Sequence, residues 1–217
     1  MEPTSSYIAV DLGLPSGRLW ADRNVGAESP EDSGLYFQWG DTVGYTADQV
    51  GKDKVFDWAN YWDSVDGSDS NFNKYAKDKL IVLEASDDAA RVNMGSDWRM
   101  PTQDEMQELI DNTTPIFIDL QGNEFSKSEA QDGAIEEYNL KGVKFTGSNG
   151  NSIFIPASGY CDNYTFDGAG ANCSMWASDL NFNNPWYACG FDFYYSGHLD
   201  TWYDGYRYYG FAVRAVK

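Results

Sequence analysis

Residues 142–156 have the sequence GVKFTGSNGNSIFIP, and they carry the clearest structural signal in the chain. Two runs rich in β-branched and aromatic residues, 142–146 and 152–156, flank the polar turn 148–151. Asn-Gly between two such runs is typical of a β-hairpin, because both central residues of the favoured turn need a positive φ. We therefore predict an antiparallel hairpin here, with Asn149 and Gly150 both at positive φ.

Outward from this hairpin, both ends of the chain are predicted to be strands. Residues 7–12 place three aliphatic side chains on one face, and residues 210–217 alternate in the same way. A Pro-Ser-Gly turn follows the first strand and leads to a second short strand at 18–21.

Two helices are expected in the middle of the chain. The first covers residues 86–93, with Ser86 as its cap and Gly95 just past its end. The second begins after Thr102, which forms a capping box with Glu105.

The other segments complete the predicted architecture. The aromatic segment 34–40 is expected in the core, and residues 41–79 form a long excursion that aromatic side chains hold in place. Strands dominate, the helices cluster in the middle, and no repeat or linker divides the chain. The fold class is therefore predicted to be α+β, with residues 1–217 forming a single domain.

Composition excludes several classes of function. Fifteen basic and thirty-four acidic residues give a net charge of −19, which opposes binding to nucleic acids and to anionic membrane surfaces. The longest apolar runs fall well short of 18 residues, so direct membrane insertion is not expected. The first seven residues are polar and show no signal peptide. The chain is either cytosolic or a mature secreted domain without its leader.

Histidine and cysteine usage predicts no metal and no cofactor. His198 is the single histidine, and Cys161, Cys173 and Cys189 form no CxxC motif. The acidic residues of 66–71 could offer oxygen ligands to calcium, but their order is not that of an EF-hand, so solvated acidic loops are expected. If the chain is secreted, a Cys161–Cys173 disulfide is favoured and Cys189 is expected to be a buried thiol.

Nine short segments support a family resemblance. They are, in order, VDLGL (10–14), LWA (19–21), NVGA (24–27), YFQWG (36–40), DDAA (87–90), WRMPT (98–102), IPASGY (155–160), MWAS (175–178) and YYGFAVRAV (208–216). Together they resemble the Fibrobacter succinogenes major paralogous domain, which is common on surface proteins of gut Bacteroidetes. The resemblance implies a C-type lectin-like fold with paired terminal strands, two helices, a mixed sheet and a loop-rich binding face. The strand at 8–12 should then pair with, or lie next to, the one at 211–216.

The last quarter of the chain has the composition of a binding surface. Residues 145–206 contain no Lys or Arg, and fourteen aromatic residues lie between positions 175 and 211, mixed with Asn, Asp, Ser and Gly. Antibody paratopes use the same mixture, although aromatic residues also fill cores. The alternation at 191–193 predicts that Asp192 points outward. One of Tyr194 and Tyr195 must point away from the core, and residues 202–206 are predicted to be a loop carrying aromatic side chains.

These features together predict a non-catalytic, adhesin-like ligand-binding domain at the cell surface or outside the cell. Its ligand would be a protein or a glycan on another cell or a host surface. The alternative is a structural, pilin-like or assembly domain of a surface appendage. The predicted binding residues are Trp186, Tyr187, Asp192, Tyr194, Tyr195, His198, Asp200, Trp202, Tyr203, Asp204, Tyr206 and Tyr208.

A second, related resemblance concerns variable proteins diversified by retroelements. Their mutagenesis acts on template adenines, so Asn codons yield Tyr, Asp, Ser, Gly, His and Phe. Residues 194–198, Asp200 and 203–206 belong to this set, whereas Trp186 and Trp202 do not. Ordinary divergence within a large surface family explains the composition nearly as well.

Catalytic alternatives are weaker. Residues 99–102 also resemble the formylglycine-generating family, but its reactive cysteine pair is not in place here. A Ser-His-Asp triad would need His198, which is expected in a solvent-facing loop. Arg99 and Arg214 lie beside core-like residues and are predicted to be buried guanidinium groups with a structural role.

Overall fold

A computed structural model describes residues 6–76 and 79–217, except for the side chain of Tyr203. The described part is mostly β-structure with three short α-helices, which confirms the α+β class. Its elements are β1 (Ala9–Asp11), β2 (Leu19–Ala21), the 3₁₀ helices η1 (Ala47–Gln49) and η2 (Trp58–Asn60), α1 (Ala89–Met94), α2 (Gln103–Asn112), β3 (Thr113–Asp119), β4 (Glu124–Ser126), α3 (Lys127–Gln131), β5 (Leu140–Gly147), β6 (Ser152–Pro156), β7 (Ser158–Asp162), β8 (Thr165–Ala169), β9 (Asn172–Leu180), β10 (Tyr187–Tyr194) and β11 (Leu199–Tyr206).

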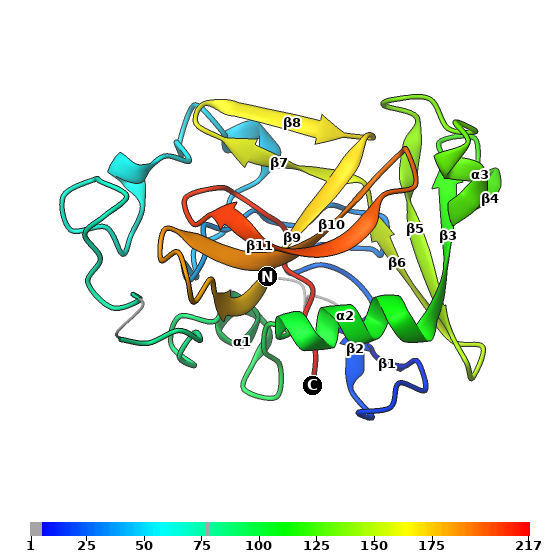
Figure 1. The fold of residues 1–217 in the computed structure, drawn as a ribbon, viewed down its shortest axis with the longest axis horizontal. Coiled ribbons are helices and arrows are strands. Elements are labelled where there is room, and N and C mark those ends of the chain that lie inside the picture. The colour runs from blue at the N-terminus through cyan, green and yellow to red at the C-terminus, as the bar shows by residue number, and fades with distance from the viewer. Residues whose placement is uncertain (1–5, 77–78) are drawn as a thin grey trace.

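Two larger sheets enclose the main core. One has the strand order β11-β10-β9-β7-β8, with β7 and β9 parallel, and the other has the order β4-β3-β5-β6. In Figure 1 the second sheet lies to the right of the first, and α2 runs below them. Side chains from both sheets and from α2 meet in one buried cluster, which includes Phe145, Phe191 and Leu109. The five-stranded sheet is therefore held firmly on one face.

The predicted hairpin is present as β5 and β6, with Phe145 paired to Ile153. Its turn differs from the prediction, because Gly150 has a φ of 85° whereas Asn149 is not at positive φ. The Gly150 amide donates to Gly147 O and the Gly147 amide donates to Asn151 O, so a single left-handed residue closes this turn. The Asn149 side chain instead donates to the carbonyl of Asp11 over 2.9 Å, which ties the hairpin to β1.

The two terminal strands were predicted to pair with, or lie next to, each other, and this prediction is wrong. β1 pairs with β2, and the C-terminal segment lies beside β2 rather than β1. The Leu19 amide donates to Lys217 O over 3.0 Å, and the Ala21 amide donates to Ala215 O over 2.9 Å. The turn after β1 folds β2 back between the two segments that were expected to pair.

Both predicted helices are present, with one change of boundary. The capping box of Thr102 and Glu105 starts α2 as expected. α1 begins after Asp88 rather than Ser86, because the Asp88 carboxylate accepts from the Arg91 amide. The third helix, α3, was not predicted.

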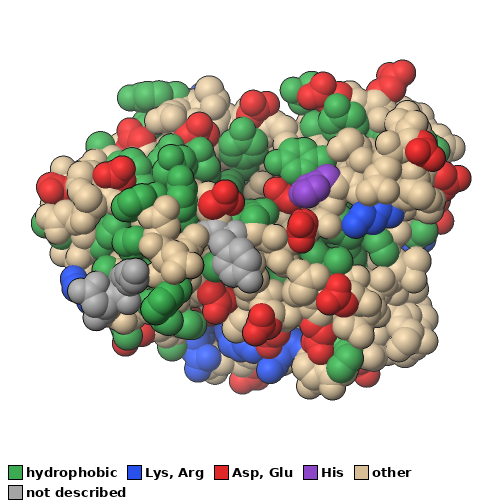
Figure 2. All heavy atoms as spheres, viewed as in Figure 1, with side chains coloured by type: hydrophobic (Ala, Val, Ile, Leu, Met, Phe, Trp, Pro, Cys, Tyr) green, Lys and Arg blue, Asp and Glu red, His purple; other side chains and the backbone are tan. Residues whose placement is uncertain are grey.

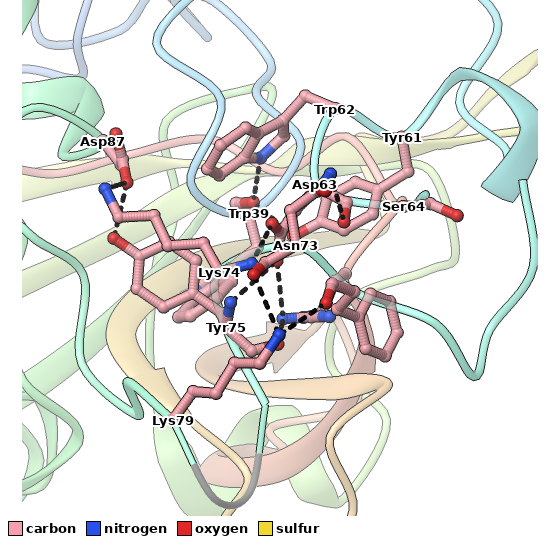
Figure 3. Close-up of polar contacts among 12 residues, drawn as sticks. Trp39, Tyr61, Trp62, Asp63, Ser64, Asn73, Lys74, Tyr75, Lys79 and Asp87 are labelled. Atoms are coloured by element: carbon pink, nitrogen blue, oxygen red, sulfur yellow. Dashed lines mark hydrogen bonds and ion pairs between the residues drawn. The ribbon is translucent and has the colours of Figure 1, made fainter. Parts of the chain in front are cut away.

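Aromatic side chains hold the excursion at 41–79 in place, as predicted, over its described residues. Asp63 is fully buried and accepts hydrogen bonds from the amides of Lys74, at 2.8 Å, and Tyr75, at 3.0 Å (Figure 3). The hydroxyl of Tyr61 donates to the carbonyl of Trp39 over 2.9 Å. These contacts join the excursion to the predicted aromatic core segment.

The cysteines do not form the favoured disulfide. Cys161, Cys173 and Cys189 are all buried free thiols, which agrees with the prediction for Cys189. Cys161 lies in a small cluster with Tyr36 and Phe56, whereas Cys173 lies in the main core. The two thiols therefore belong to different hydrophobic clusters.

Candidate functional site

A pocket of about 400 Å³ opens on the face of the five-stranded sheet that points away from the main core. Side chains alternate along β10, so Phe191 and Phe193 enter the core while Asp192 and Tyr194 line the pocket. Strand register places Asp192 opposite Ser174 of β9 on one side and opposite Asp200 of β11 on the other. The floor of the pocket is therefore polar and built on three adjacent strands.

One wall of the pocket is aromatic. Trp202 of β11 and Phe211 of the C-terminal segment have ring centroids 5.5 Å apart, and both pack on the buried ring of Trp176. Tyr209 continues the wall, 5.6 Å from Phe211, and Tyr160 of β7 lies 6.1 Å from Tyr209. These rings come from four separate segments, so tertiary packing holds the wall in shape.

Asp192 is the most unusual group in the pocket. It was predicted to lie outside the core, and it does point away from the core into the pocket, yet it is only 9 % exposed. The prediction gives the right face of the sheet but not the burial, because aromatic residues, including Trp202 and Phe211, also pack on that face. Burial raises the pKa of Asp192 to about 6, while the nearby His198 and Tyr194 act in the opposite direction. Burial also raises the pKa of Tyr194 to about 12.

His198 follows β10 in a turn and is exposed, as predicted. Its Nε2 lies 3.2 Å from Asp192 Oδ1, which is an ion-pair distance when the imidazole is protonated. Oδ1 has no well-aligned hydrogen-bond donor among the described residues, although Tyr194 and His198 both lower the pKa of the carboxylate as donors. Figure 2 shows His198 (purple) beside acidic and hydrophobic side chains on this face.

Residues 202–206 are part of strand β11, so the predicted loop is wrong. The ring of Trp202 lies against the backbone of Gly190 and Gly205, where an added Cβ would collide with it. Trp202 is half-buried and is a packing residue as well as a pocket residue. The carboxylates of Asp200 and Asp204, on the same strand, are exposed at the pocket.

The twelve predicted binding residues lie in different places. Asp192, Tyr194, His198, Asp200, Trp202 and Asp204 line the pocket. Trp186, Tyr187, Tyr206 and Tyr208 form a neighbouring aromatic cluster. Tyr195 packs against the main core instead, and the side chain of Tyr203 lies outside the described part of the structure. The other six lining residues were missed: Tyr160, Ser174, Thr201, Gly205, Tyr209 and Phe211. Alternation along their strands could have placed Tyr160 and Ser174 on this face.

The aromatic cluster extends to the excursion at 41–79. Tyr206 and Tyr208 are stacked at 5.5 Å, and Trp58 lies 5.0 Å from Tyr208. Tyr187 packs 4.7 Å from Tyr206 and lines a second pocket of about 660 Å³. That pocket also contains Asp104 and Asp179, and it shares Asp204 with the first pocket.

Arg214 is the buried structural guanidinium that was predicted, whereas Arg99 makes structural contacts but is only half-buried. Arg214 is fully buried, and its guanidinium donates to Asn24 Oδ1 over 2.9 Å, to Ala21 O over 3.1 Å and to Phe154 O over 2.9 Å. Arg99 donates to both carboxylate oxygens of Glu105. Neither arginine lines the pocket.

No family model, curated protein or solved structure matches this chain. Among residues 6–76 and 79–217, no group of three or more His, Cys, Asp or Glu side chains is placed to hold a metal ion. Within the same ranges, the helices are all too short or too polar to cross a membrane.

Proposed function

We propose that this chain is a non-catalytic ligand-binding domain and that the pocket over β9, β10 and β11 is its binding site. The observation that carries the proposal is the pairing of an aromatic wall with a carboxylate floor in one open pocket. Its volume of about 400 Å³ is within the range of small-ligand sites. A sheet packed on a core provides the rigidity that recognition requires.

The C-type lectin-like fold and the cell-surface setting form part of this proposal. A mixed sheet, and a C-terminal segment that returns beside β2 near the start of the chain, support the fold. The ligand would be a group carried by a protein or a glycan of another cell or a host. Six of the twelve residues expected to bind line one pocket, which supports recognition through the last quarter of the chain.

Diversification by a retroelement would act on this pocket, but not equally at every position. Tyr194, His198, Asp200 and Asp204 line the pocket, and their side chains could vary without altering the main core. Gly197 and Gly205 are different. An added Cβ would lie 2.7 Å from the Lys127 carbonyl at Gly197 and 2.5 Å from the Trp202 ring at Gly205. These two positions should stay glycine in any diversified set.

A subunit-contact function is the second candidate. It is supported by the aromatic cluster of Trp186, Tyr187, Tyr206 and Tyr208, with Trp58 beside it, which lies outside the first pocket and is only partly buried. Light scattering coupled to size exclusion separates the two functions. A binding domain should remain monomeric at micromolar concentration, whereas an assembly domain should form oligomers that Tyr208→Ala dissolves.

The binding function is tested on an array of glycans and surface proteins. The whole chain is compared with the double variant Tyr194→Ala/Asp200→Asn and with Tyr164→Ala. Tyr164 is 67 % exposed and does not line the pocket, so it is a matched control. We expect the double variant to lose at least tenfold in affinity, because aromatic and charged groups at a pocket dominate binding, and the control to match the wild type. Equal binding by all three proteins would contradict the proposed site.

A further inference from the structure

The pocket is strongly biased in charge. The carboxylates of Asp192, Asp200 and Asp204 line it, and His198 is the single basic side chain among its described lining residues. No lysine or arginine occurs between residues 145 and 206, which contribute most of the lining. The electrostatic field inside the pocket therefore opposes an anion and attracts a cation.

One oxygen of the Asp192 carboxylate lacks a well-aligned hydrogen-bond donor. Asp192 Oδ1 is buried and accepts no hydrogen bond within the described structure, although His198 Nε2 is 3.2 Å away. A buried acceptor without a donor is costly, and a ligand N–H group would satisfy it. The ammonium or guanidinium of a bound molecule supplies both a donor to this oxygen and a permanent positive charge.

The aromatic wall completes a cation site. The rings of Trp202, Tyr209 and Phe211 stand beside the carboxylate floor, and cations bind over the faces of such rings. A neutral sugar could also stack on these rings, but it would leave the negative charge of the floor uncompensated.

The protein already holds one of its own cations in this way. The guanidinium of Arg207, which is fully buried, lies 3.7 Å from the ring centroid of Phe72 and 5.3 Å from that of Tyr61. The carboxylate of Asp63 is 3.7 Å from Nη1 of the same arginine. Aromatic rings, a buried carboxylate and the carbonyl of Tyr75, which accepts from Nη1 over 2.9 Å, together hold a buried cation in this fold (Figure 3 shows Tyr61, Asp63 and Tyr75).

From these observations we infer that the pocket binds an organic cation, an alkylammonium or guanidinium group, between the carboxylate of Asp192 and the aromatic wall. This inference rests on the proposed binding function and names its ligand class. A volume of about 400 Å³ accommodates a polyamine or one extended Lys or Arg side chain. Asp204 is shared with the second pocket, where Asp104 and Asp179 offer a place for a second positive group.

The test measures binding of spermidine and of a pentalysine peptide to the whole chain by isothermal titration calorimetry at pH 7.5. Asp192→Asn removes the buried charge, and Asp97→Asn removes an exposed charge that does not line the pocket. We expect Asp192→Asn to weaken binding at least tenfold and Asp97→Asn to weaken it less than twofold. A melting curve of Asp192→Asn as cooperative as that of the wild type shows that its fold is intact.

The outcomes show which source of the cation the pocket prefers. They also separate failure of the cation inference from failure of the binding function. Tighter binding of spermidine assigns the site to free polyamines, and tighter binding of pentalysine assigns it to basic segments of proteins. Equal weakening by Asp192→Asn and Asp97→Asn would overturn the inference, because the attraction would then be unspecific. If a neutral array ligand binds the pocket and spermidine does not displace it, the binding function stands and the cation inference is wrong. If nothing binds the pocket, both are wrong.

Discussion

Asp192 is a carboxylate whose surroundings favour its protonated form. Burial raises its pKa in the folded protein to about 6, above the ordinary value of 3.8. His198, Asp200 and Tyr194 are the titratable groups that face it. The folded state therefore keeps this proton to a higher pH than the unfolded state does. The resulting contribution to stability is complete below about pH 4 and is lost as the pH rises through about 6.

The variant Asp192→Asn should remove this contribution. We expect the free energy of unfolding of the wild type to fall relative to the variant by about 1–3 kcal/mol between pH 4 and pH 7. Urea unfolding of both proteins at pH 4, 5, 6 and 7 measures the difference. A constant difference across this range would show that Asp192 titrates normally.

Gly205 is a position on β11 where the packing leaves no room for a side chain. An added Cβ would lie 2.5 Å from the Trp202 ring, which cannot move freely because it packs on Trp176. Gly205→Ala should therefore lower the free energy of unfolding by about 1–3 kcal/mol. Gly95→Ala is the control, because its φ of 105° strains an alanine but no atom lies within 4 Å. Thermal melting that ranks Gly95→Ala as the more damaging change would contradict this argument.

Elements governed by local rules were predictable from the sequence, and elements governed by long-range contacts were not. The hairpin β5–β6 and the capping box of α2 follow from neighbouring residues, and both are present. β11 was mistaken for a loop because aromatic residues alternate with Asp and Gly on both of its faces, so the sequence shows no apolar period. Half of the predicted site lies in the pocket. Alternation along β7 and β9 predicts which face Tyr160 and Ser174 share, but not that these strands lie in the same sheet as β10, which depends on long-range pairing.

The strand conformation of β11 changes what a substitution at Trp202 should do. A loop tryptophan would contribute to binding alone, and its replacement would leave the melting temperature nearly unchanged. Trp202 instead packs 5.8 Å from Trp176 and 5.5 Å from Phe211. Trp202→Ala should lower the free energy of unfolding by about 2–4 kcal/mol. Chemical unfolding checks this, and Tyr164→Ala, an exposed site outside the pocket, should show no comparable loss.

At the scale of the whole molecule, the last eight residues connect most of the fold. Phe211 pairs with Phe37 of the aromatic core segment, Ala212 with Met175 of β9, and Val216 with both Trp20 of β2 and Arg99. Residues 212, 213, 215 and 216 are completely buried. The segment therefore contacts the five-stranded sheet, strand β2 and the residues just before α2. It also supplies Phe211 to the pocket wall.

Removal of residues 210–217 should abolish cooperative folding, because these separate regions would lose the segment that joins them. We expect the shortened chain to show no sigmoidal thermal transition and to bind a dye that reports exposed apolar surface. Lys217→Ala is the matched control. The Lys217 backbone groups pair with Leu19, and its exposed side chain makes one cation–π contact, with Nζ 4.7 Å from the Trp98 ring centroid. This variant should therefore lose no more than about 1 kcal/mol and melt close to the wild type. A shortened chain that melted cooperatively near the wild-type temperature would mean that the sheets fold without this segment, and the pocket wall would then need another support.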